Sequence, residues 1–178
     1  NIKANLVDIV VGVSSVGLMH QAQDSSAAYV WVAVYALWLL FIKPKSSDLW
    51  VSLQAFIAQT LGFTMLLGST DLVQHSFIVS LLIWVVAWSA ARHYFSNFDE
   101  PHYKALSLAW GFLVLQTVWF ALHWLQYYEL LGILVASVVV FLSIISVTLG
   151  SLYHAYKHER LTRSLAIENT VISTLLII

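Results

Sequence analysis

The clearest pair of potential metal ligands is His154 and His158, four residues apart in the chain. On a helix this spacing places both imidazoles on one face, one turn apart, which suits two ligands of a zinc ion. Glu159 would point off that face, so a third ligand would have to come from another segment. The candidates for it are His93, His102 and Asp99. Basic residues crowd the same region, and the helix dipole and anionic lipid headgroups favour positive charge there. An interfacial role is therefore the main alternative to metal binding.

A second group of polar side chains falls within or beside long apolar runs and could form a path for protons or ions. Its members are Asp8, Gln59, Gln116, His123 and Glu168. Ionisable groups inside a bilayer usually face the protein interior or a wet cavity, and an imidazole gains and loses a proton near neutral pH. The sequence therefore raises the hypothesis of a proton relay or transport path centred on His123.

Each member of this group also has a structural interpretation. His123 could be a neutral hydrogen-bonding partner of Gln59, Thr64 or Ser80 on a neighbouring helix. Both carboxylates, those of Asp8 and Glu168, would lie in the first turn of a helix, where the dipole favours a negative charge. The basic residues placed to pair with them are Lys3 and Arg163.

Composition argues against several cofactors. The chain has no cysteine, which excludes thiolate metal sites and disulfides. Haem would need paired histidines, but the pairs His75 with His123 and His93 with His102 would lie at the two headgroup regions rather than in a dry pocket. A retinal Schiff base would need a lysine inside a late span, and the lysines outside the 43–45 turn all lie at predicted helix ends. They are Lys3, Lys104 and Lys157. No cofactor is assigned, and lipid contacts are expected.

The elements that position these residues are long apolar segments. The chain is 60% hydrophobic and only 10% charged, whereas about a quarter of residues are charged in soluble domains. Apolar runs cover 4–19, 27–42, 49–68, 76–91, 105–125, 130–153 and 165–178. About 20 apolar residues are needed for a helix to cross a bilayer. The sequence therefore predicts an all-α, polytopic transmembrane helical bundle that forms a single domain over 1–178.

Lysine and arginine occur in alternate gaps between these runs. They follow the second, fourth and sixth runs and precede the first, whereas the gaps 20–26, 69–75 and 126–129 hold none. Cytoplasmic loops of membrane proteins are enriched in Lys and Arg. We therefore expect a cytoplasmic N-terminus and cytoplasmic loops at 43–48, 92–104 and 154–164. We also expect six full spans and a seventh that is cut short at Ile178, with the natural chain continuing beyond it.

These expectations give three hypotheses for function. The leading one is a non-enzymatic subunit or scaffold of a membrane assembly, whose partners are the lipid bilayer and other membrane subunits or further copies of the chain. The first alternative is a small transporter or channel that uses the polar group containing His123. The second is a metal-dependent membrane enzyme that uses His154 and His158. With a net charge of −1 and no long basic tract, the chain is not expected to bind nucleic acid.

Overall fold

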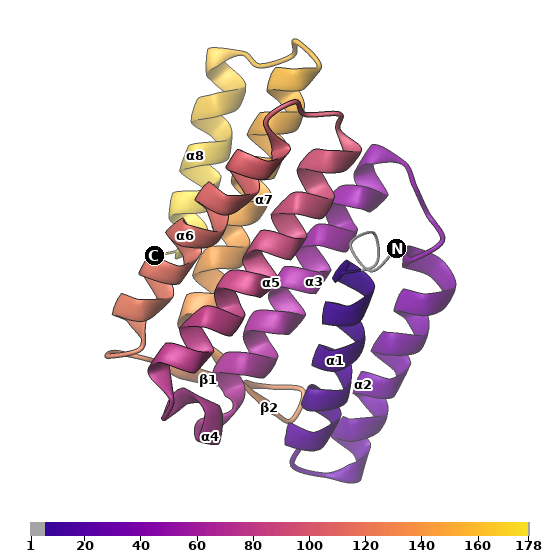
Figure 1. Cartoon of the computed structure of the whole chain (residues 1–178), viewed down its shortest axis with the longest axis vertical. Helices are drawn as coiled ribbons and strands as arrows, with labels where there is room; N and C mark the ends of the chain where they lie inside the picture. The colour runs from indigo at the N-terminus through magenta and orange to yellow at the C-terminus, as the bar shows by residue number, and fades with distance from the viewer. Residues whose placement is uncertain (1–5, 178) are drawn as a thin grey trace. The chain divides into compact units, whose positions relative to one another are not determined.

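The computed structural model describes residues 6–177, which divide into two compact units (Figure 1). Unit 1 extends to Val139 and unit 2 begins at Val140. The elements of unit 1 are the helices α1 (Leu6–Gln21), α2 (Ser25–Leu37), η2 (Trp38–Ile42), α3 (Asp48–Gly68), α4 (Thr70–Val73), α5 (Ser76–Asn97) and α6 (Tyr103–Ala121), and the strands β1 (Tyr127–Leu130) and β2 (Ile133–Ala136). Helix α7 (Ser137–Lys157) begins at the end of unit 1 and continues in unit 2, which also contains α8 (Arg163–Ile177).

Five helices are long and apolar enough to cross a membrane. They are the continuous α2–η2 helix, α3, α5, α6 and α7. The predicted all-α architecture with several helices of spanning length is therefore confirmed. The predicted count of six full spans and a shortened seventh is not, because α1 is apolar but has only 16 residues and α8 has 15. Lys3, a proposed partner of Asp8, falls outside the described residues.

A side-chain cap marks the beginning of the α2–η2 helix, and a backbone hydrogen bond closes its end. At the start, Asp24 accepts hydrogen bonds from the Ser26 hydroxyl and the Ala27 amide, at 2.6 and 2.8 Å. These bonds, with the one from Ser26 the stronger, lower the pKa of the Asp24 carboxyl. At the end the helix widens to π geometry, and the Lys43 amide donates to the Trp38 carbonyl at 2.8 Å.

Helix α3 is the central element of unit 1, with α1 and α5 packed against it and α6 packed against α5 (Figure 1). Gly62 permits close approach on two sides of α3. A Cβ atom at this position would be 2.7 Å from Val86 of α5 and 3.3 Å from Val10 of α1. A larger residue would therefore push apart helices on both sides of α3.

Residues 127–136 form a short antiparallel β-hairpin rather than the start of a helix. Its two-residue turn has positive φ at both Leu131 (52°) and Gly132 (72°), as a type I′ turn requires. The Gly132 carbonyl accepts a hydrogen bond from the Gln23 amide at 3.2 Å, which joins the turn to the α1–α2 connection. The prediction of a helix from residue 130 was wrong, because this left-handed turn cannot belong to an α-helix.

The helices of unit 1 bring its described lysine and arginine residues to one end. The Gln54 side chain bonds to the Lys45 carbonyl and to His93, which joins the 43–47 turn to the end of α5. Next to His93, the Arg92 guanidinium lies 5.7 Å from the ring of Tyr103, the first residue of α6. The α1–α2 connection, the end of α3 and the hairpin meet at the other end (Figure 1).

Unit 2 is a pair of helices joined by a short turn. Glu159 has a φ of 55°, and the Arg160 amide donates to the Ala155 carbonyl at 2.8 Å, so α7 ends in a left-handed C-terminal turn. The hydroxyls of Thr148 and Ser173 are hydrogen-bonded to each other, which joins α7 to α8.

Candidate functional site

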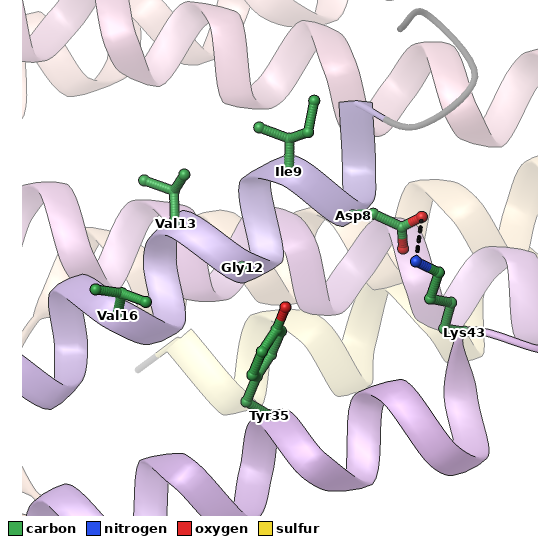
Figure 2. A pocket seen from close by; sticks show the side chains of 7 residues that line it. All are labelled: Asp8, Ile9, Gly12, Val13, Val16, Tyr35 and Lys43. Atoms are coloured by element: carbon green, nitrogen blue, oxygen red, sulfur yellow. Dashed lines mark ion pairs between the residues drawn. The ribbon is translucent and has the colours of Figure 1, made fainter. Parts of the chain in front are cut away.

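An open groove of about 580 Å³ lies between α1 and α2, next to the basic end of unit 1 (Figure 2). Its lining residues are Asp8, Ile9, Gly12, Val13, Val16, Tyr35 and Lys43. The absence of a side chain at Gly12 makes room for the Tyr35 hydroxyl, because a Cβ atom there would be 3.3 Å from it. The groove is thus mostly apolar, with polar groups concentrated towards one end.

The polar end of the groove contains an ion pair between Asp8 and Lys43. The Lys43 Nζ lies 3.2 Å from a carboxylate oxygen of Asp8, and the two side chains are 46% and 28% exposed. Asp8 lies in the first turn of α1, as the sequence predicted. The pair joins α1 to the residue that follows η2. An exposed pair of this kind contributes at most about 1 kcal/mol in water, so its main effect is to neutralise a carboxylate near the predicted membrane interface.

A more buried polar cluster, which the sequence analysis missed, is centred on Gln54 of α3. Its side-chain amide donates to the carbonyls of Ile42 and Lys45, at 2.9 and 2.8 Å. Its Oε1 lies 2.9 Å from His93 Nε2, so that nitrogen is the donor. Gln54 therefore uses both its donor and its acceptor groups to hold the end of η2, the following turn and α5 together.

The signal for this cluster was present in the sequence but ambiguous. Gln54 is an amide within an apolar run, just as Gln59 is, and only Gln59 was selected. His93 was considered as a haem or metal ligand. No sequence pattern indicates that a glutamine at the start of one helix will bond to the end of the preceding helix and to a histidine of a third.

Gln59 is also buried and bonded within the helical bundle of unit 1. Its Oε1 accepts a hydrogen bond from the indole nitrogen of Trp110 at 2.9 Å, which joins α3 to α6. Only 3% of the residue is exposed. This arrangement is the one expected of an amide that stabilises helix packing in an apolar environment.

Gln116 and His123 are not part of this buried bonding between α3 and α6. Gln116 is exposed on α6, and His123 is exposed two residues beyond the end of that helix. The His123 Nδ1 lies 3.2 Å from the Trp119 carbonyl, so the ring turns back on its own helix. Within the described part of unit 1, the predicted path residues Asp8, Gln59, Gln116 and His123 therefore do not line one common cavity.

Unit 2 contains the remaining predicted site residues. The imidazoles of His154 and His158 are neighbours on α7, with ring centroids 4.4 Å apart, as their spacing predicted. Two imidazoles provide half of the usual four-ligand zinc shell, and the described residues of unit 2 provide no third ligand close to them. Glu168 is exposed on α8.

The polar side chains of the groove and of the buried glutamines join elements of unit 1 to one another. Its two buried glutamines bond to backbone carbonyls, a histidine and an indole, and the groove places a single ion pair beside apolar side chains.

Comparison with known proteins adds no functional information. The chain matches no model of a known protein family, and neither a curated protein nor a solved structure is significantly similar to it.

Proposed function

We propose that this chain is a non-enzymatic integral membrane subunit or scaffold that works by assembling with other membrane-embedded protein. The observation that carries the proposal is that two buried glutamine side chains are hydrogen-bonded between helices. Gln54 and Gln59 are almost fully buried, and each joins helices through hydrogen bonds. A transport path would need such groups to be available to a solute or a proton in a shared cavity.

The proposed topology has six full crossings formed by α1, the α2–η2 helix, α3, α5, α6 and α7, with α8 beginning a seventh. Helix α1 is short, but contacts at its two ends show that it reaches across unit 1. Near its start Asp8 pairs with Lys43, and at its end Gln21 donates to the Met65 carbonyl of α3 at 2.8 Å. The N-terminus and the loops 43–48, 92–104 and 154–164 would then be cytoplasmic. Clustering of the described lysine and arginine residues of unit 1 at one end supports this orientation.

The test is to purify the tagged full chain from its own membrane in a mild detergent and to measure the mass of the protein in each particle. We expect a defined assembly larger than one chain, with fixed stoichiometry. The same preparation, reconstituted in phosphatidylcholine vesicles that contain a pH-sensitive dye, is expected to give no proton flux above that of empty vesicles.

Two results would refute the proposal. The first is a particle with a single chain that conducts protons or a small solute and loses this flux in His123→Ala or Asp8→Asn. The second is a stoichiometric metal ion, measured by elemental analysis, that disappears in His154→Ala together with a hydrolytic activity. The first result would establish the transport alternative and the second the metalloenzyme alternative.

A further inference from the structure

Helix α6 has one face that packs against α5 and an opposite face that is exposed. Its buried residues are Ser107, Gly111, Val114 and Val118, and this face packs against α5. Gly111 allows the Trp84 indole of α5 to approach, since a Cβ atom there would be 2.9 Å from it. The opposite face is exposed along the whole helix and continues past its end.

The exposed face has the spacing of a helix-packing surface. Its residues, which we call the α6 seam, are Ala105, Ala109, Phe112, Gln116, Trp119 and His123, and all of them are exposed. The spacing between successive members alternates between four and three residues, an average of 3.5. This is the repeat with which two helices pack along each other in a left-handed pair. Two alanines at the inner end would permit close approach of a second helix.

Gln116 indicates that lipid alone does not cover this seam. It is the polar residue between Phe112 and Trp119, which are 54% and 42% exposed. It lies about 8 Å along α6 from Ala121, the last residue of the helix, at 1.5 Å per residue. Helical side chains tilt towards the N-terminal end of their helix. For Gln116 this direction points away from Ala121, so the tilt carries the amide deeper into the predicted span. No hydrogen bond joins the Gln116 amide to another described residue of unit 1.

A second copy of the same chain is the partner that this seam fits best. A glutamine amide contains both a donor and an acceptor, so two copies related by a twofold axis along the membrane normal would place their Gln116 amides at the same depth, able to bond to each other. A single polar residue in an otherwise apolar repeat is also how paired helices fix their register. We infer that the chain forms a homodimer through the α6 seam, with Gln116 paired to Gln116 of the second copy. This inference rests on the proposed function and specifies the partner.

The chain contains no cysteine, so single-cysteine variants can test the geometry without other changes. Phe112→Cys lies on the seam, and Leu113→Cys is its control, because Leu113 is 48% exposed at nearly the same depth but points about 100° away. A disulfide needs Cα atoms within about 7 Å. After mild oxidation of the full chain in phosphatidylcholine vesicles, we expect a cross-linked dimer with Phe112→Cys and little with Leu113→Cys.

The role of the amide is tested by energy transfer between two fluorescently labelled preparations, measured in the same vesicles as lipid is added. Gln116→Leu is expected to weaken dimerisation about tenfold, and Gln116→Asn to preserve most of it. Thr117→Val is the matched control, since the Thr117 hydroxyl already bonds to the Leu113 carbonyl at 2.9 Å. Circular dichroism would establish that each variant is folded.

Equal cross-linking at positions 112 and 113, or undiminished dimerisation of Gln116→Leu, would refute the proposed dimer through the α6 seam. Neither result would refute the proposed role in a membrane assembly. A folded chain that is monomeric at every lipid ratio would also refute the dimer. If that monomer is part of a fixed-stoichiometry complex in its own membrane, the proposed function survives without the homodimer. If it is monomeric there and conducts protons, both proposals fail.

Discussion

Replacing Gln54 by leucine tests how much the buried polar cluster contributes to folding. The substitution puts an apolar side chain of similar size at this position and removes the bonds to Ile42, Lys45 and His93. A neutral hydrogen bond contributes about 1 kcal/mol net, and an unsatisfied buried partner costs more. Because the two carbonyls lie at a helix end, where water or headgroups can replace part of what is lost, we expect unfolding to become easier by about 2–3 kcal/mol.

The assay is unfolding of the purified chain in mixed micelles by increasing sodium dodecyl sulfate, followed by near-ultraviolet circular dichroism. Gln116→Leu is the matched control, measured with one chain per micelle. It removes an exposed amide that has no hydrogen bond within the described part of unit 1. We expect its free energy of unfolding to change by less than about 0.5 kcal/mol. A double-mutant cycle with His93→Leu would isolate the Gln54–His93 interaction, which we expect to be about 1 kcal/mol.

If Gln54→Leu unfolds within about 0.5 kcal/mol of the unsubstituted chain, the reasoning is refuted. Such a result would mean that solvent or lipid headgroups satisfy these carbonyls and the histidine as well as Gln54 does. The cluster would then not be what holds the 43–47 turn against α3 and α5.

Three further predictions use the same unfolding assay. Gly62→Ala would place its new methyl group 2.7 Å from Val86, so we expect a loss of about 1–3 kcal/mol; Gly12→Ala should cost less, because its nearest neighbour is the end of a flexible side chain, and equal losses would contradict this packing argument. Leu131→Gly should stabilise the chain by about 1 kcal/mol, since Leu131 has positive φ and is half exposed; a destabilised variant would show that its side chain packs usefully. Because the pKa of Asp24 is lowered in the folded state from 3.8, its contribution should be complete above about pH 4 and be lost as the pH falls further. The stability difference between the unsubstituted chain and Asp24→Asn should therefore change in that acidic range, and a constant difference would contradict the assignment.

Much of the helical layout could be predicted because it follows from composition and chain-local signals. The predicted runs 49–68 and 76–91 correspond to helices Asp48–Gly68 and Ser76–Asn97. The hairpin at 127–136 was missed because its second strand is as apolar as the helix that follows it. Leu131 and Gly132 adopt a left-handed turn there, and leucine is a residue for which sequence does not predict that conformation.

The candidate site was less predictable, because hydrogen-bonding partners come from helices distant in sequence. Gln59 was selected as a path residue, yet its bond is to Trp110. Asp8 was correctly placed in the first turn of its helix. Its ion pair with Lys43, which follows a different helix, was not considered in the sequence analysis. Transport and metal binding by the predicted residues stay hypotheses that the experiments above decide.

Sequence alone determined that this protein consists of long apolar helices and that its lysine and arginine residues fall in alternate gaps between the apolar runs. Both properties depend only on short segments of sequence, namely the length of each apolar run and the charge of each gap. Only the tertiary structure decided which polar side chains are satisfied inside the chain and which are left exposed. That distinction depends on the rotation of each helix about its axis, and this is set by packing at places such as Gly62 and Gly111, where neighbouring helices approach closely.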